Sequence, residues 1–296
     1  MKWRNIIFAK QMHHIAAGDA SFNFPSALEK HRKLCYNKIR KAAGVLTPDK
    51  PRGDKNMSKK VWNGFERLDF SFEGREAILI VPEQPNTNRN WLLKTEYFGA
   101  FPSFEIEMLK RGWHLAYIKN ITRWCIDEDL DLKKRFAEYL HKQYGLYHKC
   151  VPVGMSCGGL IASKFAAKHP SLVSALYLDA PVMNLLSCPA GIGNAGNDML
   201  PEFINATGIS LSVLTYYRDH PIDKMPLLLK NNIPIMLVYG DSDNVVPYHE
   251  NGAVLEKYYL ENGGIIEAIG KENCGHHPHG LEDNTPIIEF VEKYSL

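Results

Sequence analysis

The hexapeptide Gly-Met-Ser-Cys-Gly-Gly at 154–159 constrains the fold most, because it places a glycine-flanked serine between a strand-like and a helix-like segment. The apolar run at 150–153 precedes it, and the helical pattern of 160–168 follows it. A Gly-x-Ser-x-Gly pentapeptide in this setting is typical of a nucleophile elbow, a sharp turn that exposes the serine hydroxyl. Side chains in place of the flanking glycines would collide with the neighbouring strand or helix. The hexapeptide therefore predicts a strand, a strained turn at Ser156 and a helix.

The pentapeptide alone leaves two interpretations open. A glycine-rich turn between a strand and a helix can also hold a phosphate group at the helix N-terminus. A nucleophilic serine, in contrast, needs a base that takes its proton, and the base works best when a carboxylate fixes its tautomer. Acidic residues and histidines later in the chain therefore bear on the choice between the two.

Both residue types do follow the serine, each directly after an apolar run. Two aspartates follow the run at 234–239, and three histidines follow the run at 264–270. The order serine, acid, histidine distinguishes one serine-hydrolase fold from others. This order favours a catalytic triad over a phosphate site and leaves several residues open for each role. The candidates are Asp241 and Asp243 for the acid, and His276, His277 and His279 for the base.

Short apolar runs and helix-like segments alternate from residue 66 onward. The first two runs are separated only by Glu73-Gly74 and predict an antiparallel hairpin, whereas the later runs alternate with helices and predict parallel βαβ units. We therefore expect an α/β fold with one eight-stranded, mostly parallel sheet and helices on both faces. The expected strands are 66–72, 75–82, 90–98, 113–119, 149–155, 174–180, 234–240 and 264–270, and the expected helices are 103–111, 129–144, 157–169, 249–262 and 284–295.

Two segments depart from this alternation. Residues 1–60 are polar, helix-like and rich in lysine and arginine, and are predicted to form a solvated extension ahead of one domain at 61–296. A second interpretation is a basic flank that attracts an anionic substrate such as a uronic-acid sugar. Residues 182–232 contain a stretch rich in glycine and proline and several short helical pieces. An insertion there would overhang the carboxyl ends of the strands, where ligands bind in open α/β folds, and is predicted to be a small lid.

The composition excludes several classes of protein. An apolar content of 45% and a charged content of 23% are ordinary for a globular protein. A net charge of +2 gives no reason to expect nucleic acid, and no apolar stretch is long enough for a membrane span. The apolar run near the N-terminus is too short for a signal peptide, and the six cysteines are scattered. We expect a cytoplasmic protein with free thiols and without nucleic-acid or membrane partners; the oligomeric state stays open.

From about residue 66 to the C-terminus, the sequence resembles the α/β-hydrolase superfamily. Besides the elbow, the resemblance rests on Gly-x-x-Asp-x-x-Val-Pro at 240–247 and on Gly-His-x-Pro-His at 275–279. It implies Asp243, at the fourth position of the first motif, as the acid ahead of Asp241, with Asp179 after the sixth expected strand as a further alternative. It also implies His276, the first histidine of the second motif, as the base ahead of His277 and His279. No carboxylate or cysteine set with ligand spacing accompanies the histidines, so we expect no metal site.

An oxyanion hole needs two backbone donors. One is expected from the N–H of Cys157, which directly follows the nucleophile, and the other from the loop at 94–102. The usual His-Gly pair is absent from that loop, which leaves Tyr97 or Glu96 as the second donor, with Tyr97 preferred. Lys94 and Glu96 are expected either at the mouth of the site or as a salt-bridged pair within the loop.

Three segments, at 94–102, 112–118 and 275–281, resemble bacterial α/β-hydrolases related to prolyl-oligopeptidase-type and carbohydrate-esterase proteins. The resemblance implies a serine hydrolase that uses a Ser–His–Asp acyl-enzyme mechanism without a cofactor. It favours a carboxylesterase acting on a polar or carbohydrate-linked ester, with a small molecule or an oligosaccharide as the substrate. An aminopeptidase or thioesterase with the same triad is the alternative, and a non-catalytic ligand-binding protein is the alternative from another class. Candidate substrate-binding residues are Glu96, Phe98 and Trp124, although aromatic side chains in such loops serve equally well in packing.

Overall fold

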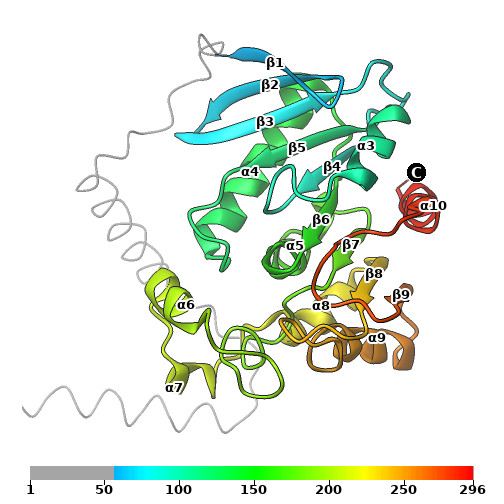
Figure 1. The fold of residues 1–296 in the computed structure, drawn as a ribbon. Coiled ribbons are helices and arrows are strands. Elements are labelled where there is room, and N and C mark those ends of the chain that lie inside the picture. Colours follow the sequence, from blue (N-terminus) through cyan, green and yellow to red (C-terminus); the bar gives the residue numbers. More distant parts are fainter. Residues whose placement is uncertain (1–56, 296) are drawn as a thin grey trace, which may run out of the picture. The chain divides into compact units, whose positions relative to one another are not determined.

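Within the residues that the computed structural model describes, 57–295, nine strands form a single sheet (Figure 1). The strand order is β1-β2-β3-β5-β4-β6-β7-β8-β9. The first three pairs in this order, β1–β2, β2–β3 and β3–β5, are antiparallel. The remaining pairs are all parallel. The predicted extension at 1–60 lies outside the described residues except for its last four positions. The strands are β1 Ser58–Trp62, β2 Phe65–Phe72, β3 Arg75–Val81, β4 Trp91–Lys94, β5 His114–Ile118, β6 Val151–Met155, β7 Leu176–Asp179, β8 Ile235–Gly240 and β9 Ile266–Lys271.

The expectation of eight strands was wrong because β1 was missed. This strand pairs only with β2 at one edge of the sheet, and four of its five residues are exposed, so no apolar run marks it. The local signal lay in the turn instead. Asn63 and Gly64 join Trp62 to Phe65 with φ values of 49° and 88°, and Asn-Gly is the preferred dipeptide of two-residue hairpins. The predicted hairpin at Glu73-Gly74 is confirmed, since β2 and β3 are antiparallel neighbours.

Helices cover both faces of the sheet, as predicted. The β8 strand shows the alternation that this requires: Ile235 and Leu237 belong to the core on one face, and Met236 and Val238 to the core on the other. Helices α4, α5, α8 and α9 contribute to the first core, and α3 and α10 to the second (Figure 1). No helix within residues 57–295 has the length and apolar character needed to cross a membrane. The helices of the sheet layers are α3 Ser103–Lys110, α4 Asp127–Tyr144, α5 Cys157–Lys168, α8 Met225–Lys230, α9 Gly252–Glu261 and α10 Thr285–Tyr294.

The segment predicted as a lid, 182–232, leaves β7 and returns to β8. It holds two short helices, α6 Leu200–Thr207 and α7 Leu211–Leu214, ahead of α8. Phe203 and Leu214 are almost fully buried in the first core, so the segment packs on the same face of the sheet as α4, α5, α8 and α9. Its action as a lid stays a prediction. Three short 3₁₀ helices complete the described chain: η2 Pro170–Leu172, η3 Pro221–Lys224 and η4 Tyr248–Glu250.

The topology brings four loops to one edge of the sheet. Strands β6, β7, β8 and β9 are consecutive neighbours and run parallel, so their carboxyl ends lie at the same edge. The expected elbow follows β6, Asp179 ends β7, and the aspartates and histidines of the two later motifs follow β8 and β9. This edge is where open α/β sheets bind ligands.

Candidate active site

Ser156 lies at the sharp turn between β6 and α5, as the hexapeptide predicts. Its backbone has φ 54° and ψ −121°, a region that costs free energy for any residue with a side chain. Two hydrogen bonds to the segment at 179–182 hold this conformation. The Ser156 N–H donates to the carbonyl of Asp179 at 2.9 Å, and the Ser156 carbonyl accepts from the N–H of Val182 at 3.1 Å. The turn at Ser156 is therefore attached to the end of β7 and to the residues that follow it.

The glycines around the serine differ in how strictly they are required. A Cβ at Gly154 would lie 2.4 Å from the carbonyl oxygen of Gly158, and a Cβ at Gly159 would lie 2.3 Å from the Cβ of Pro181. Both distances are too short for any side chain. A Cβ at Gly158 would meet the Thr95 hydroxyl at 3.2 Å and Glu96 Cβ at 3.4 Å, contacts that a small shift relieves. Gly154 and Gly159 therefore permit the close packing of strand, helix and loop that the turn needs.

Ser156, His276 and Asp243 form a continuous chain of contacts. His276 Nε2 lies 3.0 Å from Ser156 Oγ, and His276 Nδ1 lies 2.7 Å from Asp243 Oδ2. The other carboxylate oxygen, Asp243 Oδ1, accepts hydrogen bonds from the N–H groups of Val245 at 2.8 Å and Val246 at 2.9 Å. Burial acts to raise the pKa of Asp243, but the His276 and backbone hydrogen bonds outweigh it and hold the pKa below its usual value. The arrangement provides an ionised acid, an oriented imidazole and a hydroxyl within reach of the imidazole.

The alternative acids and bases lie elsewhere in this region. Asp241 is exposed and accepts a hydrogen bond from the Ser242 hydroxyl. Asp179 is paired with His279, whose Nδ1 lies 2.7 Å from Asp179 Oδ1. The other oxygen of Asp179 accepts from the Gly280 N–H at 2.6 Å and from the hydroxyl of Tyr177 at 3.2 Å. The structure thus contains a second histidine–aspartate pair next to the first, which sequence reasoning did not identify as a pair.

The two oxyanion-hole candidates come from the start of α5 and from the loop after β4. Cys157 is the first residue of α5, so its N–H has no carbonyl partner within the helix. Its side chain is 1% exposed, and burial raises the pKa of the thiol to about 11, which suits a packing role for the sulfur. Tyr97 has φ 54° and its N–H donates to Glu96 Oε1 at 3.2 Å. Cys157 therefore presents a helix-terminal donor, whereas the Tyr97 donor is engaged by its neighbour.

The loop after β4 differs in part from expectation. Lys94 does not stand at the mouth of the site or pair with Glu96. It is 1% exposed within β4, and its ammonium lies 2.5 Å from Glu105 of α3. The expectation for Lys94 was wrong because this lysine ends β4 inside the protein, and its partner Glu105 comes from the next helix and not from the loop. Glu96 instead accepts from the amide of Asn120 at 2.5 Å, and Asn120 in turn accepts from buried Lys133.

The two aromatic candidates for substrate binding are engaged in packing. The Phe98 ring lies 5.4 Å from that of Trp62 and 5.5 Å from that of Tyr117. Trp124 is 2% exposed and meets Phe203 of α6 edge-on at 5.5 Å. Among the described contacts, none joins either ring to Ser156, Asp243 or His276. Their assignment to substrate binding stays a prediction.

Arg123 is a polar residue of this region that sequence reasoning missed. Its Nε donates to Glu202 of α6 at 2.8 Å, and its Nη1 lies 3.5 Å from the Tyr97 hydroxyl. The ion pair with Glu202 raises the pKa of Arg123 further above its usual value. No local pattern marks this arginine, because both partners come from other segments. It connects the loop that carries Tyr97 to the segment predicted as a lid.

Comparison with known proteins shows the fold. No protein-family model matches the chain, and no curated protein of similar sequence was found. Among solved structures, an acylaminoacyl peptidase of Pyrococcus horikoshii matches with a TM-score of 0.59 and 14% identity over 81% of this chain and 42% of its own. A putative dipeptidyl aminopeptidase IV of Bacteroides ovatus matches with a TM-score of 0.58 and 12% identity over 84% of this chain and 37% of its own. The chain thus spans less than half the length of either protein. Both are prolyl-oligopeptidase-like α/β-hydrolases, and this chain has the α/β-hydrolase fold.

Proposed function

We propose that the chain is a serine hydrolase that forms an acyl-enzyme at Ser156. The observation that carries this proposal is the unbroken line of contacts from Ser156 through His276 to Asp243. In the proposed reaction, His276 Nε2 takes the hydroxyl proton while the serine oxygen attacks the substrate carbonyl. The protonated imidazole then passes that proton to the leaving group, and Asp243 stabilises the charge on the ring. Water, activated by the same histidine, releases the acid and regenerates the serine.

The negative oxygen of the tetrahedral intermediate requires donors beside the serine. We assign one to the Cys157 N–H, because it lies at the N-terminus of α5, where the helix dipole also favours negative charge. The predicted second donor, the N–H of Tyr97, contacts the Glu96 carboxylate at 3.2 Å. An oxyanion that accepted this N–H would have to displace the carboxylate. Substrate binding and a movement of Glu96 are therefore coupled in this proposal.

The class of bond is a separate question, since one triad cleaves both esters and amides. The two similar solved structures are named as peptidases. Their names support the aminopeptidase alternative better than the carboxylesterase expected from the sequence. We therefore propose cleavage of an amide bond near the N-terminus of a short peptide as the first candidate. A polar or carbohydrate-linked ester, which the sequence resemblance favours, is the second.

Two experiments test the proposal in turn. The full chain and a Ser156→Ala variant are incubated with a fluorophosphonate probe, and labelling of the unmodified protein alone is expected. Absence of labelling in both proteins would refute the hydrolase proposal and favour the non-catalytic ligand-binding alternative. The substrate class is then compared with aminoacyl and N-acylaminoacyl anilides, p-nitrophenyl acetate, acetylated sugars and methyl uronates. Turnover of the esters without turnover of any anilide would reject the peptidase assignment.

A further inference from the structure

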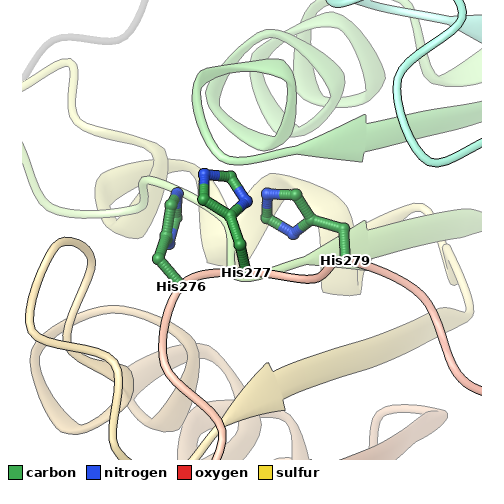
Figure 2. A group of neighbouring side chains, drawn as sticks. All are labelled: His276, His277 and His279. Carbon is green, nitrogen blue, oxygen red and sulfur yellow. The ribbon is translucent and has the colours of Figure 1, made fainter.

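Three imidazole rings stand side by side on the loop after β9 (Figure 2). Each of His276, His277 and His279 offers a ring nitrogen, and these nitrogens all lie within 4.8 Å of one another. His276 and His279 are buried, whereas His277, which lies between them in Figure 2, is exposed. The proposed hydrolysis uses only the first of the three rings. The cluster therefore carries more imidazole nitrogens than the reaction requires.

The two buried rings are oriented in the way that a metal ligand requires. His276 Nδ1 lies 2.7 Å from Asp243, and His279 Nδ1 lies 2.7 Å from Asp179. Because a carboxylate can only accept, each Nδ1 carries the hydrogen and each Nε2 directs its lone pair away from the carboxylate. The lone pair of His276 Nε2 faces the Ser156 hydroxyl at 3.0 Å. Metal-bound histidines usually donate their second ring nitrogen to a carboxylate in this manner. The two aspartates also place negative charge behind the rings, which favours a cation.

His277 is the third ligand of the proposed site, and its side chain is the one that can change position. Its ring stacks on Phe101 at a centroid distance of 5.5 Å, and its exposure leaves the side chain free to change rotamer. Metal–nitrogen distances of about 2.0–2.1 Å place the nitrogens of a tetrahedral site roughly 3.3 Å apart. The present separation of up to 4.8 Å must therefore shorten on binding. Rotation of the exposed ring can shorten its own two distances, whereas the two buried rings must approach each other through a small movement of the loop that carries them.

We propose that His276, His277 and His279 bind one divalent cation of the zinc class, for which imidazole is a preferred ligand. A bound cation would occupy the His276 Nε2 lone pair, which is the same lone pair that must accept the Ser156 proton. The cation is therefore an inhibitor and not a cofactor of the proposed reaction. Metal binding itself depends only on the three rings and their carboxylates. The inhibitory consequence alone rests on the proposed function.

The first test measures binding without reference to activity. The full chain, free of any histidine tag and stripped with a chelator, is titrated with Zn²⁺ against a chromophoric zinc indicator. One equivalent should bind, and His277→Ala should weaken binding at least about tenfold. His148→Ala is the matched control, because His148 is also exposed and its ring contacts that of His141. Binding that His277→Ala leaves unchanged, or that His148→Ala weakens equally, would overturn the proposed site.

The second test measures inhibition. Zn²⁺ should slow fluorophosphonate labelling of Ser156, excess chelator should restore it, and His277→Ala should need at least about tenfold more metal for the same effect. The variant keeps Ser156, His276 and Asp243, so its rate without metal should equal that of the unmodified protein. If the protein never labels, the hydrolase proposal fails while the binding titration still decides the metal site. Stoichiometric zinc binding without any change in labelling would refute the inhibition.

Discussion

The Asp243→Asn variant provides the sharpest test of the proposed triad, because the structure determines how the new amide must lie. Asp243 Oδ1 accepts the N–H groups of Val245 and Val246, so this position must keep an oxygen. The amide NH₂ of the asparagine then faces His276 Nδ1, where the carboxylate Oδ2 stood at 2.7 Å. A donor facing Nδ1 selects the tautomer with the hydrogen on Nε2. That hydrogen points at Ser156 Oγ, and the ring can no longer accept the serine proton.

We expect the variant to lose about 10⁴-fold in kcat, equivalent to about 5.4 kcal/mol of transition-state stabilisation. Stability should change far less, because the two backbone hydrogen bonds remain and a neutral hydrogen bond to the ring replaces the ionic one. A loss below about 2 kcal/mol in the free energy of unfolding is expected. The measurements are kcat on the best substrate of the panel, the rate of fluorophosphonate labelling, and urea unfolding followed by tryptophan fluorescence.

The matched control is Asp241→Asn, which alters an exposed aspartate in the same loop and should leave kcat within about twofold. An Asp243→Asn variant that kept a rate within tenfold of the unmodified protein would refute the tautomer argument. A large loss in Asp179→Asn together with a normal rate in Asp243→Asn would move the acid to the end of β7. Equal losses in the two loop variants would show that the loop as a whole was disturbed.

Three further predictions concern the elbow and the buried lysine. Ser156→Ala should lose all turnover and shift Tm by no more than a few degrees, measured by calorimetry, because the side chain contributes little to the core. Gly159→Ala should lower the free energy of unfolding, measured with urea, by at least about 1–3 kcal/mol, because its Cβ would lie 2.3 Å from Pro181. Gly158→Ala, whose shortest new contact is 3.2 Å, should keep a free energy of unfolding close to that of the unmodified protein. Equal destabilisation by both would contradict the steric argument. Burial lowers the pKa of Lys133 from 10.5 to about 8, so between these pH values the unfolded chain binds a proton that the folded chain does not. Stability measured by urea unfolding should therefore rise with pH over this window, and Lys133→Met should abolish the rise.

The features that the sequence predicts well depend on local patterns. Most strands and helices lie within a few residues of their expected ranges, because apolar runs and helical periodicity reflect burial against the sheet. The elbow could be recognised for a related reason, since its glycines stand close to Ser156 in the sequence and a Cβ at Gly154 would meet the nearby backbone of Gly158. The order of Ser156, Asp243 and His276 made the triad predictable as a hypothesis. Its contacts now support the three roles without measuring them.

The features that the sequence could not predict depend on partners far along the chain. His279 and Asp179 are 100 residues apart, and nothing in either segment points to the other. Lys94 looked like a loop charge because its partner, Glu105, belongs to the following helix. The rings of Phe98 and Trp124 are apolar surfaces that suit a ligand or a core equally well. Which of these they meet is decided by packing between segments.

The two histidine–aspartate pairs have a consequence for how the site can vary. His276 is attached to the loop after β8 and His279 to the end of β7, so only positions 277 and 278 lie between two anchored residues. A substitution at 277 can change the exposed side chain beside His276 without moving the His276 imidazole. An insertion or deletion there would instead shift the spacing of the two anchors and misplace that ring. The side chain at position 277 can thus be replaced by another type, whereas the number of residues between His276 and His279 must stay the same.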